Sequence, residues 1–230
     1  MGHAERVPAC ELVVLDVNET LSDLEPLRAR FTELGAPGHL LETWFAGTLR
    51  DGFALATSGR ARPFREVGAA VLTGLLSHAE GLRAPVGEAV ATVLDAVVAL
   101  DVHPDVPAGL RALAEAGLRV VTLTNGSLAQ SAELLERAGV SHLVERRLSV
   151  DDAGRWKPHP DAYRYASAQC GVALDRCAMV AVHPWDLQGA AAVGMVTGWV
   201  DRRGTPWPAV FPEPTATGTT LGEVARALAP

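Results

Sequence analysis

The sequence predicts an α/β fold, a Rossmann-like doubly wound parallel sheet with an inserted helical cap, and two observations carry this prediction. Short continuous apolar segments recur along the chain, and segments with the apolar spacing of helices lie between them. Glycine residues stand where several of those helical segments stop, at Gly117, Gly139, Gly171 and Gly194. Strand and helix in regular alternation are typical of a sheet with helices on both faces.

The expected strands are apolar throughout, which is typical of a parallel sheet buried on both faces. They cover residues 12–15, 119–123, 178–182 and 195–200. The expected helices of the same domain cover residues 107–116, 128–138, 160–169, 188–193 and 221–228. In such sheets ligands bind beyond the carboxyl ends of the strands, where Asp16, Thr124 and residues 183–186 fall.

Residues 25–100 have a different pattern, and we expect them to form a helical cap domain. Apolar side chains have helical spacing around residues 40–49 and 67–75, with Gly74 interrupting the second stretch, and no apolar strand segment occurs. The cap would be inserted into an α/β catalytic core made of residues 1–24 and 101–230. Within that core, residues 201–220 are rich in Pro, Gly and Thr and are expected to be loop.

Composition excludes several classes of protein. The 230 residues are 48% hydrophobic and 20% charged, as in ordinary globular proteins, and the net charge of -7 argues against a nucleic-acid partner. No apolar run approaches the ~20 residues that span a bilayer, and the chain does not start with a basic and then apolar leader. Three widely spaced cysteines, Cys10, Cys170 and Cys177, argue against a disulfide framework and a zinc site. We therefore expect a cytoplasmic protein that binds no membrane.

Four short motifs follow one another along the expected core. They are Asp16-Val17-Asn18-Glu19-Thr20-Leu21, Leu123-Thr124-Asn125-Gly126-Ser127, Trp156-Lys157-Pro158-His159-Pro160, and Trp185-Asp186 before a Gly-Ala helix. In this order, over residues 11–200, the chain resembles the haloacid dehalogenase superfamily, which implies a sheet of the haloacid dehalogenase type. Its Asn-Gly-Ser second motif and Trp-Asp fourth motif are most similar to the (S)-2-haloacid dehalogenase (type II) branch.

The resemblance implies a hydrolase in which Asp16 is the covalent nucleophile and Thr20 positions it. It also implies that Lys157 steadies the nucleophile and that Asp186 is the carboxylate of the fourth motif. A cation beside Asp16 would lower the pKa of that carboxyl group and keep it ionised, and Pro158 makes the turn after Lys157 rigid. The side chains expected to line the substrate site are those of Asn18, Phe45, Thr124, Asn125, Tyr163 and Trp185.

Two departures from the superfamily's phosphatases concern proton transfer and metal. Those enzymes carry a second aspartate two residues after the nucleophile, which protonates the leaving alkoxide, but this chain has Asn18 there, and an amide cannot donate a proton in that way. They also carry an acid four residues before the position of Asp186, where this chain has Val182. Mg²⁺ requires hard oxygen ligands, so we expect no metal and no cofactor, with magnesium only if the chain is a phosphatase.

Two further departures concern the dehalogenase branch itself. Phe45 stands where the branch has a cap arginine that helps to receive the halide, and Arg50 nearby does not align with it. His183 stands where the branch usually has asparagine. Its imidazole could donate to a leaving group or act as the base that hydrolyses the ester, and it could equally be a packing residue that caps a helix.

The function expected first is hydrolytic dehalogenation of a small 2-haloalkanoic acid through an aspartyl-ester intermediate. One alternative is a phosphatase of the same superfamily, which Asn18 and Val182 disfavour. A second is a non-catalytic member that binds a small carboxylate or a partner protein, and Phe45 is the main support for it. The partner expected is a small-molecule substrate, and a homodimer is a further expectation because branch members are often dimers.

Overall fold

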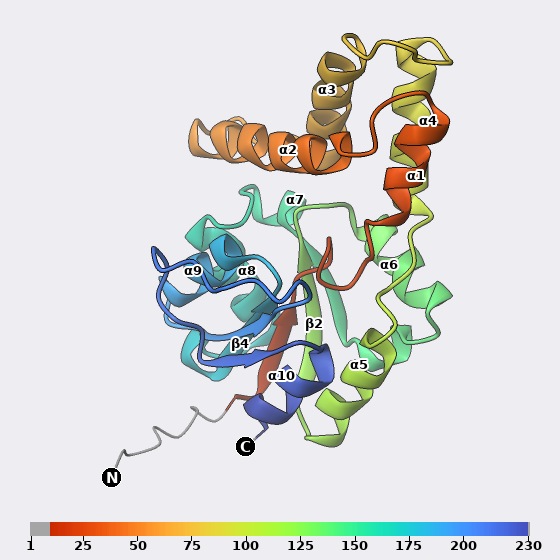
Figure 1. Cartoon of the computed structure of the whole chain (residues 1–230). Coiled ribbons are helices and arrows are strands. Elements are labelled where there is room, and N and C mark those ends of the chain that lie inside the picture. The colour runs from red at the N-terminus through yellow and green to blue at the C-terminus, as the bar shows by residue number, and fades with distance from the viewer. Residues whose placement is uncertain (1–9, 230) are drawn as a thin grey trace.

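The computed structural model describes residues 10–229, so the first nine residues and the last residue of the expected core lie outside the described part. Figure 1 shows an α/β body with the chain's C-terminal end at its lower edge and a separate layer of helices above it. Among the described residues, no helix combines the length and the apolar character needed to cross a bilayer.

The centre of the body is a six-stranded parallel sheet with the strand order β3-β2-β1-β4-β5-β6. The strands are β1 (Leu12–Leu15), β2 (Arg119–Thr124), β3 (Arg146–Ser149), β4 (Cys177–Ala181), β5 (Val196–Val200) and β6 (Ala216–Gly218). The first strand lies between β2 and β4, with Leu15 opposite Thr122 on one side and Val180 on the other. This arrangement confirms the predicted doubly wound α/β fold.

Helices cover both faces of the sheet because side chains of successive strand residues point to opposite faces. Leu12 and Val14 of β1 belong to one apolar cluster, together with residues of α8 (Pro160–Cys170) and α9 (Pro184–Ala191). Val13 and Leu15 belong to a second cluster. That cluster includes residues of α5 (Val106–Glu115), α6 (Leu128–Arg137) and α10 (Leu221–Leu228). A short helix, α7 (Val150–Ala153), and two 3-10 turns (Ser141–Leu143, Leu174–Arg176) complete the body.

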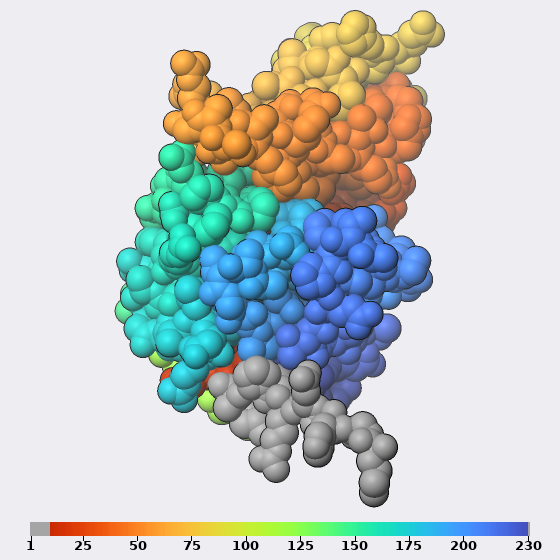
Figure 2. Space-filling view, turned by 90° about the vertical axis from the view of Figure 1, so that its left-hand side faces the viewer, coloured from red at the N-terminus to blue at the C-terminus, as the bar shows by residue number. Residues whose placement is uncertain are grey.

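Four helices form the layer above the sheet: α1 (Pro26–Glu33), α2 (Leu40–Thr57), α3 (Phe64–Leu76) and α4 (Val86–Val98). We call these residues 26–98 the cap. The long helix α2 runs across the top of the α/β body, and the space-filling view shows the cap seated on that body (Figures 1 and 2). One contact explains how closely they fit: a Cβ built on Gly52 of α2 would lie 2.0 Å from the Trp156 ring, so only glycine allows this approach.

Several sequence predictions about elements were wrong or incomplete. The helix expected at 188–193 begins at Pro184, because proline is favoured in the first turn of a helix, where its missing N–H costs nothing. Residues 201–220 are not all loop, since they contain β6. Strand β3 was not predicted because its first two residues are exposed arginines. Helices α1 and α4 were also missed within the cap.

Candidate active site

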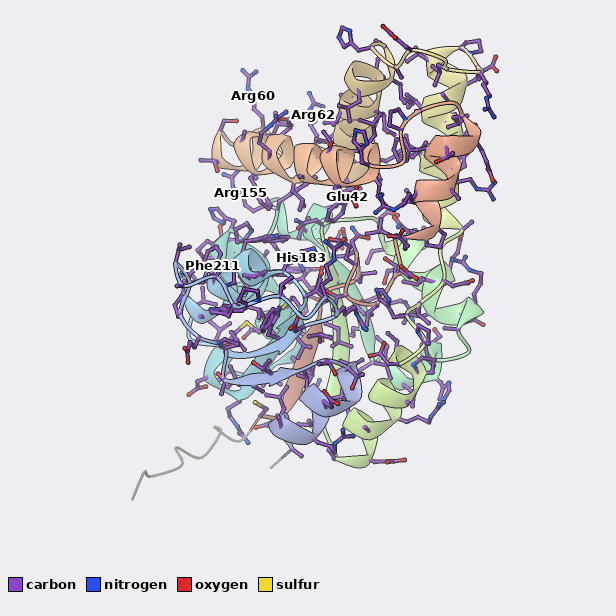
Figure 3. The ribbon with its side chains drawn as sticks, in the orientation of Figure 1. Glu42, Arg60, Arg62, Arg155, His183 and Phe211 are labelled. Carbon is purple, nitrogen blue, oxygen red and sulfur yellow. The ribbon has the colours of Figure 1, made fainter. Side chains whose placement is uncertain are left out.

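Three neighbouring strands bring the candidate residues together at one edge of the sheet. Asp16 follows the last residue of β1, Thr124 ends β2, and His183 comes two residues after β4. Because the strands are parallel and adjacent, their carboxyl ends meet below α2. Figure 3 shows His183 there, with Glu42 on the underside of α2 above it.

The carboxylate of Asp16 is buried, and both of its oxygens accept hydrogen bonds. Lys157 Nζ donates to Oδ1 over 2.9 Å, Thr20 Oγ1 donates to Oδ2 over 2.7 Å, and His183 Nδ1 lies 3.1 Å from Oδ2. Thr20 Oγ1 also accepts the backbone N–H of Val182 over 3.1 Å, which ties the turn after β1 to the end of β4. Burial would raise the pKa of Asp16, but the charges of Lys157 and His183 outweigh it and hold that pKa well below its ordinary value.

Lys157 is a fully buried cation between two carboxylates. Its Nζ lies 2.9 Å from Asp16 Oδ1 and 2.6 Å from Asp186 Oδ2. Burial opposes the charged form, yet the two carboxylates together raise the lysine pKa. The backbone of Lys157 is fixed by Asn125, whose Oδ1 accepts its N–H over 2.9 Å and whose Nδ2 donates to its carbonyl over 3.2 Å. Asn125 therefore positions Lys157.

Asp186 lies in the first turn of α9 and is fully buried. Its Oδ1 accepts a hydrogen bond from Tyr163 OH over 2.7 Å, and its Oδ2 accepts the one from Lys157. Burial raises the pKa of Asp186, while the charge of Lys157 opposes the shift. Burial and the nearby Asp186 charge also raise the pKa of Tyr163 well above its ordinary value, so the phenol stays a hydrogen-bond donor.

His183 lies between two carboxylates. Its Nδ1 faces Asp16, and its Nε2 lies 2.9 Å from Glu19 Oε2. Since neither carboxylate can donate, both ring nitrogens carry protons and the ring is an imidazolium. Burial would lower the pKa of His183, but the hydrogen bonds to Asp16 and Glu19 outweigh it and raise the pKa to about 9. Glu19 in turn accepts a hydrogen bond from Arg203 over 2.8 Å.

Glu19 and Arg203 are functional candidates that the sequence reasoning missed. Glu19 lies inside the first motif, but a charged residue in a turn gives no signal that it faces a histidine 164 positions away. Arg203 lies in a Gly- and Pro-containing loop that has no motif at all. Only the three-dimensional structure brings these two residues to the site.

Aromatic side chains stack with the imidazole of His183. The Phe45 ring, on α2 of the cap, lies 5.9 Å from it between centroids, and the Trp185 ring lies 5.1 Å from it. The angles between ring planes are 26° and 27°, which makes both contacts stacked. Phe53, also on α2, meets Trp185 edge-on at 5.0 Å. The cap therefore contributes an apolar cover to His183.

Two of the expected substrate-site residues make different contacts. Thr124 Oγ1 accepts the backbone N–H of Gly126 over 2.9 Å, so it shapes the turn after β2. Asn18 is buried in the turn after β1, and its backbone is bridged to Ser22. A Cβ built on Gly126 would lie 3.6 Å from Asn18 Nδ2, which places this amide beside the second motif.

A cavity of about 570 Å³ lies between the cap and the α/β body. Its apolar wall includes Leu41, Phe45 and Leu49 of α2. Glu19 and His183 line it, whereas Asp16, Lys157 and Asp186 do not. The His183 ring thus faces the cavity and also contacts the buried Asp16 carboxylate.

The donor set does not fit a magnesium ion. Both oxygens of Asp16 and both of Asp186 are already hydrogen-bonded, and Lys157 Nζ lies between these two carboxylates. By the resemblance to the superfamily, Asn18 and Val182 stand at positions where its phosphatases carry acidic residues. Within residues 10–229, no group of three or more His, Cys, Asp and Glu side chains is arranged to hold a metal ion.

Comparison with known proteins gives a consistent result. Residues 10–194 match a family described as haloacid dehalogenase-like hydrolase. Haloacetate dehalogenase H-2 of Moraxella sp. (strain B) is 37% identical over 101 residues, which are 44% of this chain and 45% of that protein. The (S)-2-haloacid dehalogenase of Pseudomonas sp. (strain YL) is 35% identical over 115 residues, 49% of each chain. The matched stretches span about half the length of these curated relatives.

A phosphatase is also among the relatives. The phosphoserine phosphatase of Thermus thermophilus is 36% identical over 101 residues, 44% of this chain and 41% of that protein. Among solved structures, a dehalogenase with an intermediate complex has a TM-score of 0.88 and 25% identity, over 97% of this chain and 99% of that one. The cap and the α/β body thus have the same arrangement in a known dehalogenase.

Proposed function

This chain belongs to the haloacid dehalogenase-like hydrolases, and from that premise we propose that it hydrolyses the carbon–halogen bond of a small 2-haloalkanoic acid. The observation that carries the proposal is the surroundings of Asp16. Its carboxylate is kept ionised by Lys157 and oriented by Thr20, as a nucleophile requires. Asn18, two residues later, offers no acid for a leaving group. A halide leaves without a proton, whereas the alkoxide of a phosphate ester requires one.

In the first half of the reaction, an oxygen of Asp16 attacks C2 of the substrate. A carbon–oxygen bond forms, the carbon–halogen bond breaks, and the halide leaves with the bonding electrons. The product is an ester on Asp16. Lys157 keeps the carboxylate ionised before the attack, and Asp186 holds Lys157 through a second ion pair.

In the second half, water attacks the ester carbonyl of Asp16. Two groups are candidates for the base that activates this water. Asp186 has both oxygens engaged by Lys157 and Tyr163. His183 Nδ1 lies 3.1 Å from Asp16 Oδ2, beside the carbonyl that water would attack, and its ring lines the cavity. We therefore propose that His183 is the base and that Asp186 positions Lys157.

The position of His183 bears on its other expected role, as a donor to the halide. In an in-line displacement, the halide departs on the side of C2 opposite to the attacking Asp16 oxygen. A ring nitrogen 3.1 Å from that carboxylate is on the nucleophile's side. The geometry therefore favours His183 as the base for ester hydrolysis rather than as the donor to the halide.

Halide release tests this proposal. The purified protein is incubated with bromoacetate, chloroacetate and both enantiomers of 2-chloropropionate, and free halide is measured. The same preparation is assayed with a generic phosphate ester, and Asp16→Asn is the matched control. We expect halide release by the parent protein and none by the variant. Phosphate release with no halide release would favour the phosphatase, and neither release would favour a member that only binds ligand.

We also propose that the site works without a metal and that its substrate is a small molecule. The absence of a metal is proposed because the oxygens of Asp16 and Asp186 are already hydrogen-bonded. The small-molecule substrate is proposed from the cavity and from the similarity to dehalogenases. A homodimer, the absence of a nucleic-acid partner and a cytoplasmic location stay predictions from the sequence. Size-exclusion chromatography with light scattering tests the homodimer.

A further inference from the structure

Glu19 is the residue of this site whose position the dehalogenation chemistry leaves unexplained. Its backbone φ is 61°, which lies in the left-handed region that residues other than glycine rarely adopt. Such a conformation is strained and persists where the surroundings impose it. Here His103 Nε2 lies 3.0 Å from the Glu19 carbonyl, and Thr20, the next residue, is bonded to Asp16.

The carboxylate of Glu19 has two partners. Oε2 lies 2.9 Å from His183 Nε2, and Oε1 accepts a hydrogen bond from Arg203 over 2.8 Å. The side chain of Glu19 is 22% exposed and that of His183 is 11% exposed, so the pair lies where the cavity meets the buried site. The chain of contacts therefore runs from Asp16 through His183 and Glu19 to Arg203.

We propose, on the basis of the proposed function, that Glu19 is a positioning residue. Its carboxylate accepts the Nε2–H of His183, so that the Nδ1 of His183 becomes a proton acceptor once Asp16 is an ester. Before the reaction, Asp16 and Glu19 share an imidazolium between them. Ester formation removes the negative charge of Asp16 and leaves Glu19 as the one carboxylate bonded to the ring. The first half of the reaction thereby prepares the base for the second.

The protons balance over one cycle. When the ester forms and the halide leaves, the Nδ1 proton passes through water in the cavity to solvent. Water then attacks the ester carbonyl carbon, and Nδ1 takes one of its protons. As the bond between that carbon and the substrate oxygen breaks, the departing alkoxide takes the second proton from the new carboxyl group. Asp16 is again a carboxylate facing an imidazolium, and one proton and one halide have been released.

Other charged groups near His183 contribute to its protonation. From the α/β body these are Asp16, Glu19, Asp23, His103, Lys157, Asp186, Asp201, Arg202 and Arg203, and from the cap and the residue before it Glu25, Arg28 and Glu42. Arg28 is ion-paired with Glu42, and Arg202 with Asp105 over 2.7 Å. Asp186 is paired with Lys157, so Asp16 and Glu19 are the carboxylates that contact the ring directly. Esterification of Asp16 and substitution of Glu19 are therefore the changes that most alter the proton affinity of His183.

Glu19→Gln separates the two halves of the reaction. With bromoacetate under single-turnover conditions, bromide measures ester formation, and the intact mass of the quenched protein measures the ester. We expect bromide release close to the parent rate, and ester hydrolysis slower by about tenfold or more, because the orienting carboxylate becomes a neutral amide that holds the Nε2–H of the general base more weakly. The midpoint of the pH dependence of ester hydrolysis should also move to lower pH, since an anion beside His183 has been removed.

Two companion variants make the result specific. Glu145→Gln removes a carboxylate paired with Arg119, away from the site, and should leave both halves unchanged. Arg203→Met removes the cation beside Glu19 and should move the pH midpoint the opposite way, by less because Arg203 is 70% exposed. Circular dichroism and the melting temperature of each variant establish that it is folded.

The outcomes distinguish the two proposals. Equal slowing of ester formation and hydrolysis in Glu19→Gln, or an unmoved pH midpoint, would overturn the role of Glu19 while the dehalogenase stands. A parent protein that releases no bromide and shows no ester would overturn the proposed function itself.

Discussion

The phenyl ring of Phe45 and the imidazole of His183 are stacked, with centroids 5.9 Å apart and ring planes at 26°. One ring belongs to the cap and the other to the α/β body, so the contact joins the two at the site. A cation over an aromatic face is stabilised by the ring's electrons, and His183 is charged in the free protein. The dehalogenase branch that this chain resembles has arginine and asparagine at these two positions. At this pair of positions the charged side chain therefore belongs to the α/β body, and the uncharged one belongs to the cap.

Phe45→Arg should therefore lower activity, although it restores the residue typical of the branch. A guanidinium in place of the ring would lie against an imidazolium, and like charges at this distance repel. We expect kcat/KM for bromoacetate to fall at least about tenfold, which corresponds to about 1.4 kcal/mol. Steady-state halide release measures it.

The matched variants for this prediction are Phe45→Leu and Phe45→Arg with His183→Asn. Leucine keeps an apolar cover and should have a smaller effect. The double variant removes the repulsion but also removes the proposed base, so these variants are compared in a single turnover. There the bromide released by the double variant should exceed that of Phe45→Arg alone, as expected for coupled positions. Additive losses in the double variant would mean that the two residues act independently.

Stability should depend on pH through His183. Its pKa is raised from 6.5 to about 9 in the folded protein. A group with a raised folded-state pKa contributes stability that is fully present below its unfolded pKa and is lost as pH rises through the folded value. The free energy of unfolding should thus fall by about 3 kcal/mol between pH 6.5 and 9. Urea unfolding across this range measures it.

His183→Gln and His142→Gln are the pair of controls for the pH dependence. His142 is exposed, in the turn after α6, and its replacement should leave unchanged the slope of the free energy of unfolding against pH. Loss of His183 should flatten it. A slope identical in the parent protein and in His183→Gln would mean that this histidine is not charged between its two carboxylates.

Chelation should leave halide release unchanged. The oxygens of Asp16 and Asp186 are bonded to Lys157, Thr20 and Tyr163, and Asn18 is no substitute for an acidic ligand. Activity is measured after dialysis against EDTA and again after Mg²⁺ is added. Loss of activity with EDTA and its recovery with Mg²⁺ would show a metal-dependent site and favour the phosphatase.

The buried strands of the sheet were predictable because they are apolar on both faces. Val13 and Val14 point to opposite sides of β1, and both are buried, so the run is continuous in the sequence. The edge strands were not predictable in this way. Strand β6 has three residues and lies in a Pro- and Thr-rich stretch, and β3 begins with two exposed arginines, so neither has the pattern of a buried strand.

The resemblance to a known family predicted part of the candidate site. Asp16 and Thr20 come from one motif, and Lys157 and Asp186 fall in the third and fourth motifs, so the resemblance alone predicted that they meet. The contact of Glu19 with His183 depends on a left-handed turn at Glu19. The two bonds between Asn125 and the backbone of Lys157 depend on the path of the loop before α8. Neither contact can be predicted from residue type or from spacing along the chain.

A single turnover in water enriched in heavy oxygen tests most directly whether Asp16 attacks carbon. Excess protein is mixed with bromoacetate, and the peptide containing Asp16 and the hydroxy acid product are analysed by mass spectrometry. If Asp16 forms the ester and water attacks its carbonyl, the label appears in Asp16 and the first product molecule is unlabelled. Label in the product with Asp16 unlabelled would mean that water attacks the substrate directly, and Asp16 would not be the nucleophile.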